Sequence, residues 1–368
     1  MANRKRAAHF LLVPELAGSP PNEAVVQALG ELGYEVDLYA PGGRGRADGG
    51  ASPAVFPAEY SRRWILKHAL SPWWRRYALF SGTTEDPMAL VGVLAWLHRR
   101  PSVTLADEIK RDAYRGNRPE WWKRLCRWAM RRSTLSVVLE AEQAELQREY
   151  AGLRPDHLVV VYPSCFRIPP GPGDRSQLRR DAAIPDDAIA LVYSGVFGHS
   201  LGVEWMLVAL DQISNLHVLA QLVNLDPLAR ALLRRTSGRE RLHVEDRTGE
   251  RRLSWREAWS SVVAGDIGMA VYHHSGSQWL RMGTSSNRLC MFLAMGIPVI
   301  VSRQTSFEFV EKYDCGVMVD SERGFVDAIR SIGQRLPEMK RNALRCAEEY
   351  IDAPGRYRAL VVALGAVR

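Results

Sequence analysis

Four consecutive residues, Ser285-Ser286-Asn287-Arg288, have the types and spacing of an anion-binding site. They stand just before an apolar run that begins at Leu289. The backbone N–H groups of such a turn and the positive end of the following helix dipole attract negative charge. Arg288 adds a planar fork of donors that matches phosphate. The pattern predicts a site for a phosphorylated ligand; the alternative is a surface helix that begins before a core strand.

The residues after this turn predict a helix and then a buried strand. The apolar run ends near Met295, and Gly296 stands where a helix C-cap is expected. The sequence Pro-Val-Ile-Val at 298–301 is typical of a strand buried on both faces. A turn placed between a strand and a helix is a common position for ligand contacts in α/β proteins.

The whole chain alternates between predicted strands and helices, which indicates parallel sheets. Residues 163–187 interrupt this texture with five prolines, as an interdomain linker does. We therefore expect an N-terminal domain at 1–165, joined by a last helix at 351–368, then a linker at 166–187 and a second domain at 188–350.

Composition narrows the class of protein. A chain of 368 residues is too long for one ordinary core, and its net charge of +8 favours polyanionic partners. The five cysteines are scattered without a Cys-x-x-Cys pair, so we expect a reducing cytoplasm and neither disulfides nor a zinc site. The longest apolar stretch, 289–301, is too short to cross a bilayer.

The order of several motifs between about 188 and 320 resembles the order in glycosyltransferases of the GT-B fold, closest to the type-4 retaining family. The segment 193–198, Tyr-Ser-Gly-Val-Phe-Gly, resembles the glycine turn after the first strand of the nucleotide domain. Residues 202–210 resemble the helix that follows, and 265–271 the strand before the donor loop. Residues 286–299 are similar to the donor motif of that family, with Arg288 where a lysine is usual.

The resemblance implies an α/β protein with two Rossmann-like domains whose parallel sheets face a central cleft. It implies transfer of a sugar from a nucleotide-sugar donor to an acceptor hydroxyl, in cell-surface glycan or polysaccharide biosynthesis. The anomeric configuration is retained, and neither a metal nor a cofactor beyond the nucleotide-sugar is needed. The implied donor-binding residues are Gly195, Val196, Phe197, Gly198, Tyr272, Arg281, Ser285, Ser286, Asn287, Arg288 and Leu289.

Two positions depart from the family pattern. The family often has two glutamates about eight residues apart, of which the second holds the donor ribose; Gly283 and Met291 stand at these positions here. This departure keeps two alternatives open. One is a non-catalytic GT-B-like partner that binds a glycan or a membrane, and the other is a sugar-nucleotide epimerase of the same fold.

In the N-terminal half, polar residues follow predicted strands. Asp107 and Glu108 are candidates for contacting the acceptor hydroxyl or for acting as a base, and capping of a helix is the alternative. Ser19, Asn22 and Asp86 are candidates for acceptor binding, with ordinary loop and capping roles as the alternative. The acceptor is expected to be a glycan, a lipid-linked molecule or a small molecule.

Two segments of the N-terminal half combine tryptophans with basic residues, at 62–76 and at 121–132. In the second, Trp121, Leu125 and Trp128 are expected to share one helical face. Such patterns suit attachment to an anionic membrane surface, so we expect a cytoplasmic protein at the inner face of the membrane. The alternative is a helix that packs on its own sheet. No nucleic-acid-binding motif is present, and no nucleic acid partner is expected.

Overall fold

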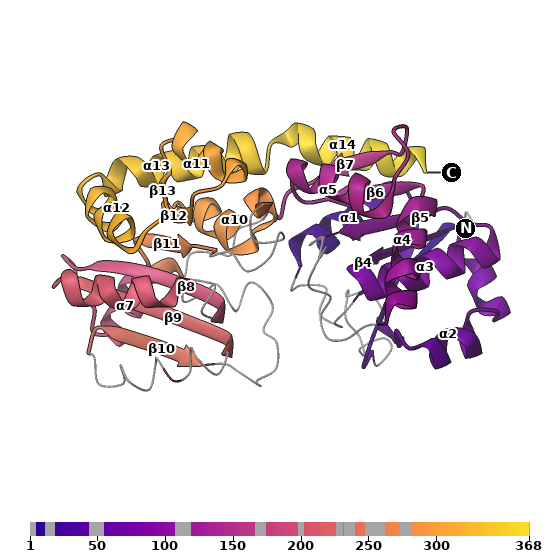
Figure 1. The fold of residues 1–368 in the computed structure, drawn as a ribbon, viewed down its shortest axis with the longest axis horizontal. Coiled ribbons are helices and arrows are strands. Elements are labelled where there is room, and N and C mark those ends of the chain that lie inside the picture. The colour runs from indigo at the N-terminus through magenta and orange to yellow at the C-terminus, as the bar shows by residue number, and fades with distance from the viewer. Residues whose placement is uncertain are drawn as a thin grey trace. The chain divides into compact units, whose positions relative to one another are not determined.

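The computed structural model describes residues 5–11, 19–43, 55–106, 119–165, 174–197, 202–225, 231, 240–246, 262–272 and 281–367. The chain forms two compact units (Figure 1). Unit 1 comprises Met1–Pro163 together with Pro354–Arg368, and unit 2 comprises Ser164–Ala353. No helix among these described ranges is long and apolar enough to cross a bilayer.

Unit 1 is built on a parallel sheet of seven strands in the order β3-β2-β1-β4-β5-β6-β7. The strands are β1 (Lys5–Phe10), β2 (Tyr34–Ala40), β3 (Val55–Pro57), β4 (Leu79–Thr83), β5 (Ser102–Ala106), β6 (Leu135–Val138) and β7 (Val159–Val161). Its helices are α1 (Pro20–Glu31), α2 (Arg62–His68), the 3-10 helix η2 (Pro72–Arg76), α3 (Glu85–His98), α4 (Glu120–Arg132), α5 (Ala141–Ala151) and α14 (Pro354–Ala366).

Each face of this sheet has its own helices, because successive strand residues point to opposite sides. Tyr39 of β2 packs in one core with Trp74 of η2 and with residues of α3 and α4, while its neighbour Leu38 packs in another with Val26 of α1. Helix α14 lies beside α1, and the Tyr357 hydroxyl donates to Oε1 of Glu31 over 2.9 Å. The last helix of the chain therefore completes unit 1.

Unit 2 has a parallel sheet of six strands in the order β10-β9-β8-β11-β12-β13. The strands are β8 (Ile189–Phe197), β9 (Leu216–Leu225), β10 (Leu242–Asp246), β11 (Ile267–Ala270), β12 (Val299–Ser302) and β13 (Gly316–Val319). The described α-helices are α6 (Arg175–Asp181), α7 (Val203–Gln212), α10 (Asn287–Ala294), α11 (Glu308–Lys312), α12 (Glu322–Gln334) and α13 (Leu336–Cys346). Single turns are the 3-10 helices η4 (Val262–Ala264), η6 (Gly283–Ser285) and η7 (Thr305–Phe307), and η8 (Ala347–Ile351) is a π-helix.

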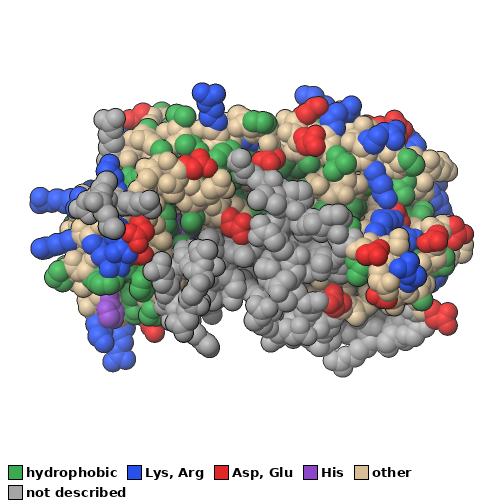
Figure 2. Space-filling view, turned by 180° about the vertical axis from the view of Figure 1, so that it is seen from behind, with side chains coloured by type: hydrophobic (Ala, Val, Ile, Leu, Met, Phe, Trp, Pro, Cys, Tyr) green, Lys and Arg blue, Asp and Glu red, His purple; other side chains and the backbone are tan. Residues whose placement is uncertain are grey.

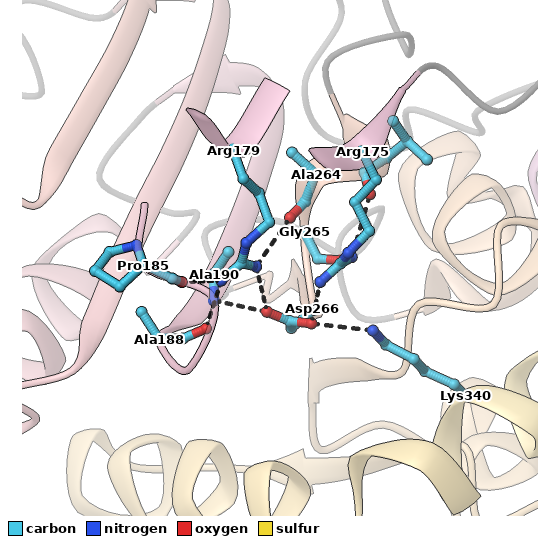
Figure 3. Close-up of polar contacts among 10 residues, drawn as sticks. Arg175, Arg179, Pro185, Ala188, Ala190, Ala264, Gly265, Asp266 and Lys340 are labelled. Carbon is cyan, nitrogen blue, oxygen red and sulfur yellow. Dashed lines mark hydrogen bonds and ion pairs between the residues drawn. The ribbon is translucent and has the colours of Figure 1, made fainter. Parts of the chain in front are cut away.

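Helix α6 lies inside the segment that the prolines mark as a linker, yet it packs on unit 2. Arg179 and Arg175 reach from α6 to Asp266, which precedes β11, over 2.9 and 2.6 Å (Figure 3). Lys340 of α13 donates to the same carboxylate over 3.0 Å. Burial raises the pKa of Asp266, but these charges outweigh burial and hold the pKa below its usual range. Ion pairing thus makes α6 part of the second unit.

Candidate functional site

The chain order of unit 2 reverses at β8, and this creates a crevice. Strand β9 lies on one side of β8 and β11 lies on the other, so the connections leave the sheet in opposite directions. Ligands of open α/β sheets bind at such a point, at the carboxyl ends of the strands. Gly195 lies near the carboxyl end of β8, Tyr272 follows β11, and α10 begins at Asn287.

Arg288 is the central charge of this crevice. It is only 8% exposed, and its guanidinium carbon lies 4.3 Å from the ring centroid of Tyr193 and 5.7 Å from that of Tyr272. Within the part of the chain that the structure describes, its Nε and Nη1 atoms have no hydrogen-bond partner. Buried donors of a charged group are costly to leave unpaired, so this geometry is typical of a site that an anionic ligand completes.

The electrostatic surroundings keep Arg288 charged. Burial acts to lower the pKa of its guanidinium, but the hydroxyl groups of Tyr193 and Tyr272 outweigh burial and raise the pKa. The two rings also offer their faces to the cation. The charge is therefore permanent and held in one place before any ligand arrives.

Gly195 allows the guanidinium to approach the backbone of β8. Its φ is +123°, in the region that favours glycine, and the pairing with β9 shifts register between Gly195 and Val196. A Cβ at this position would lie 3.2 Å from Nη2 of Arg288. The glycine turn and the arginine that the sequence singles out are therefore neighbours in space.

The start of α10 is fixed by two hydroxyl groups. Ser286 is the N-cap, and its Oγ accepts from the N–H of Leu289 over 3.2 Å. The same Oγ lies 2.6 Å from the hydroxyl oxygen of Tyr272, and the N–H of Tyr272 donates to Oγ of Ser302 over 3.2 Å. These contacts hold the helix start against β11 and β12 and make the crevice rigid.

The remaining predicted donor residues occupy different environments. Ser285 is buried and donates its hydroxyl to the carbonyl of Met282, whereas Arg281 is exposed. Leu289 is fully buried, and its N–H is used by Ser286. Asn287 is exposed at the first position of α10. Val196 and Phe197 end β8, but their side chains lie outside the described residues, as does all of Gly198.

Two site residues are absent from the sequence-based prediction. Tyr193 stands two positions before Gly195 on β8, so strand alternation puts both on one face, a signal that could have found it. Ser164 donates its N–H to the carbonyl of Thr284 over 2.9 Å, and its hydroxyl bonds to Oδ1 of Asn287. No local pattern predicts the contacts of Ser164 with Thr284 and Asn287, because Ser164 is far from both in the sequence.

Gly283 and Met291, which stand at the positions of the two missing glutamates, are both buried. Gly283 has a φ of +41° and is buried in η6, where an L side chain would strain the turn. Met291 is fully buried in α10. Both residues therefore serve the packing of this segment.

In unit 1, two predicted acceptor residues belong to a buried polar chain around His9 of β1. Nδ1 of His9 lies 2.7 Å from Oγ of Ser81, and Nε2 lies 3.0 Å from Oδ1 of Asn22. The side-chain amide of Asn22 then donates to Oγ of Ser19 over 2.8 Å. Burial lowers the pKa of His9 to about 4, so the ring is neutral at physiological pH.

The order of the unit 1 strands also reverses, between β1 and β4, and Thr83 and Thr84 lie at the carboxyl end of β4. Thr84 has φ 62° and ψ 174°, which is strained for a β-branched residue. Among the described side chains, neither threonine hydroxyl has a hydrogen-bond partner. Asp86 accepts from the indole N–H of Trp122 over 2.6 Å and so ties α3 to α4. Asp107 and Glu108 lie outside the described residues.

Comparison with known proteins identifies the fold. Residues 23–164 match the model of Glycosyltransferase Family 4. Sucrose-phosphate synthase from Thermosynechococcus elongatus has the same fold, with a TM-score of 0.69, 15% identity and coverage of 98% of both chains. The chain has the GT-B fold, which it shares with glycosyltransferases. This confirms the GT-B fold and the two Rossmann-like domains that the sequence predicts.

Two further solved structures resemble this chain. Anabaena HepE in complex with UDP has a TM-score of 0.70 at 14% identity and covers 98% of this chain and 100% of its own. A putative UDP-N-acetylglucosamine 2-epimerase from Listeria monocytogenes has a TM-score of 0.59 at 11% identity, with coverage of 98% and 96%. No curated protein matches the chain in sequence. The fold is therefore more similar to sucrose-phosphate synthase and HepE than to this epimerase.

Proposed function

We propose that this protein is a glycosyltransferase that transfers a sugar from a UDP-sugar to an acceptor hydroxyl, and that Arg288 binds the diphosphate of the donor. The observation that carries the proposal is the buried guanidinium of Arg288 at the switch point of unit 2, whose Nε and Nη1 have no partner among the described residues. HepE, which has a similar fold, has been crystallised with UDP and with UDP-glucose, and this supports uridine as the base.

The proposed chemistry uses the charge of Arg288 directly. As the bond between the anomeric carbon and the β-phosphate oxygen breaks, negative charge grows on the leaving diphosphate. Donors that are already in place stabilise this charge more than they stabilise the intact sugar nucleotide, so they lower the barrier. The acceptor oxygen bonds to the anomeric carbon, and its proton passes to an oxygen of the leaving diphosphate. We propose retention of configuration without a metal, with Asp107 and Glu108 as candidates for contacting the acceptor.

We propose that unit 1 binds the acceptor at the switch point between β1 and β4. Thr83 is buried, Thr84 is strained, and both hydroxyls lack partners within the described ranges, which favours a ligand with hydroxyl groups of its own. An acceptor for cell-surface glycan or polysaccharide assembly, handled in the cytoplasm at the inner face of the membrane, is consistent with this chemistry.

Calorimetric titration with UDP, GDP, ADP, CMP and dTDP tests the donor site. We expect selective binding of UDP. In Arg288→Met we expect affinity about 10- to 100-fold lower, because a hydrogen bond to a charged group contributes about 1.5–3 kcal/mol. Arg303→Met is the matched control, since Arg303 of unit 2 is half-exposed and pairs with Asp320 over 3.5 Å. Unchanged UDP binding in Arg288→Met would contradict the assignment.

A further inference from the structure

The two basic, aromatic segments of unit 1 have different surroundings in the structure. Helix α4 buries Trp122, Cys126 and Met130 against unit 1. Its close approach to α3 depends on Gly92, where a Cβ would lie 2.3 Å from Cβ of Ala129. The buried face therefore differs from the predicted face with Trp121, Leu125 and Trp128, and the packing alternative holds for most of α4.

The first segment, by contrast, leaves large apolar side chains in solvent. In α2 and the turn after it, Leu66 is 70% exposed and Leu70 is 75% exposed, while Trp73 of η2 is 48% exposed. Ile65 and Trp74 are buried beneath them and anchor the segment to the core. Isolated exposed leucines are ordinary. Several large apolar side chains exposed on one short segment, however, mark a site of interaction with a membrane or another molecule.

The charges on this segment have one sign. Arg62, Arg63, Lys67 and Arg75 are exposed, and residues 61–76 contain no acidic residue. The guanidinium of Arg62 also lies 5.9 Å from the ring of Trp121, which is exposed at the start of α4. Lys, Arg and hydrophobic side chains gather at the lower left of Figure 2, over the region of α2. Basic side chains interleaved with exposed Leu and Trp are typical of an interfacial membrane segment.

Trp73 is fixed by contacts with Tyr39 and Arg76, and it lines a small surface cavity. Its indole N–H donates to the hydroxyl of Tyr39 over 3.0 Å, and the Arg76 guanidinium lies 3.1 Å from its ring centroid. The cavity has a volume of about 230 Å³ and is lined by Tyr39, Phe56, Pro57, His68, Ser71, Trp73 and Trp74. This mainly aromatic lining provides an apolar recess next to the basic residues.

We infer that the α2–η2 surface, defined as the exposed side chains of Arg62, Arg63, Leu66, Lys67, Leu70, Trp73 and Arg75, binds the surface of an anionic lipid bilayer. The leucines and Trp73 enter the boundary between headgroups and acyl chains, and the basic side chains pair with lipid phosphates. This inference concerns unit 1 alone, so it stands or fails independently of the donor site in unit 2.

Co-sedimentation of the full chain with lipid vesicles tests the inference. We expect binding to vesicles of phosphatidylcholine with roughly 30% phosphatidylglycerol to exceed binding to phosphatidylcholine alone at least about tenfold, and to weaken with salt. Leu66→Ser with Leu70→Ser, and separately Arg62→Gln with Arg63→Gln and Lys67→Gln, should each reduce binding about tenfold or more. The thermal unfolding temperature of both variants should stay close to that of the wild type, which would show that unit 1 is still folded.

Matched controls change equally exposed residues elsewhere. Val362→Ser on α14, where Val362 is 65% exposed, and Arg323→Gln on α12, where Arg323 is 92% exposed, should bind vesicles like the wild type. Three results would overturn the inference. One is equal binding to uncharged vesicles, and another is loss of binding in Trp96→Ser but not in the α2 variants. The third is retention on single-stranded RNA that the charge variant abolishes and the leucine variant does not.

Discussion

Two buried arginines of unit 2 make an informative pair. Arg179, near the amino end of β11, donates to Asp266 over 2.9 Å and to the carbonyls of Pro185 and Ala188 over 2.6 and 2.7 Å (Figure 3). Arg288, near the carboxyl ends of β8 and β11, is buried to a similar degree, but two of its nitrogens have no partner in the described ranges. An arginine at one edge of the sheet thus binds protein groups and stabilises the fold. An arginine at the other edge keeps donors that a ligand can use.

The largest effect on stability should come from removing the ion pair between Arg179 and Asp266. Arg179→Met leaves the Asp266 carboxylate buried with fewer partners, and we expect a loss of about 3 kcal/mol in the free energy of unfolding. The loss is at the lower end of the usual range because Arg175 and Lys340 still contact Asp266. Urea unfolding measures it.

Arg330→Met serves as the control for Arg179→Met, because Arg330 is half-exposed and pairs with Asp327 over 3.3 Å. We expect a change of about 0–1 kcal/mol there. Equal stabilities of the two variants would mean that the Asp266 cluster does not hold α6 in place.

A second buried polar group, His9, should make stability depend on pH. Its folded-state pKa is about 4, below the ordinary 6.5, so the unfolded chain binds the proton more tightly. The stabilisation is complete above about pH 6.5 and is lost as the pH falls toward 4, by about 3 kcal/mol in all. Urea unfolding between pH 7.5 and 4.5 should show this loss, and His9→Gln should flatten it. An equal slope in both proteins would assign the pH dependence to other groups.

Gly195→Ala tests how closely the open arginine must approach β8. An alanine at φ +123° costs about 1–2 kcal/mol of stability, and its Cβ would press on Nη2 of Arg288. We expect UDP affinity to fall about tenfold in calorimetry. Gly355→Ala is the control, since a Cβ there has no atom within 4 Å. Wild-type UDP affinity in Gly195→Ala would show that Arg288 can move without loss.

The smallest effect on stability should come from the arginine that matters most for binding. Arg288→Met replaces a partly unpaired buried charge with an apolar side chain of similar length, so we expect the free energy of unfolding to stay equal or to rise by about 1 kcal/mol. Thermal unfolding without nucleotide measures it. A loss as large as that of Arg179→Met would show that Arg288 is structural and would remove the contrast between the two residues.

Much of the secondary structure around Arg288 could be predicted from local sequence, whereas the helix that carries Arg179 could not. The N-cap at Ser286, the helix after it and the strand from Val299 are confirmed, because small polar residues, apolar spacing and Gly296 act locally. Helix α6 was not predicted, since its seven residues are polar apart from Leu178 and follow a proline-rich stretch. Its place depends on Asp266, 87 positions from Arg179. In α4, contact with α3 at Gly92 decided which face is buried.

By itself, the sequence determined the alternation of strands and helices, the glycine turn at Gly195 and the basic residue at the start of a helix. These depend on side-chain size, backbone freedom and the period of apolar residues, all of which act over a few positions. Only the tertiary structure decided that Arg288 is enclosed by Tyr193 and Tyr272, with Nε and Nη1 unpartnered within the described part of the chain. It also decided that Leu66 and Leu70 stay exposed. Burial depends on which distant segments pack together, and no local pattern specifies that.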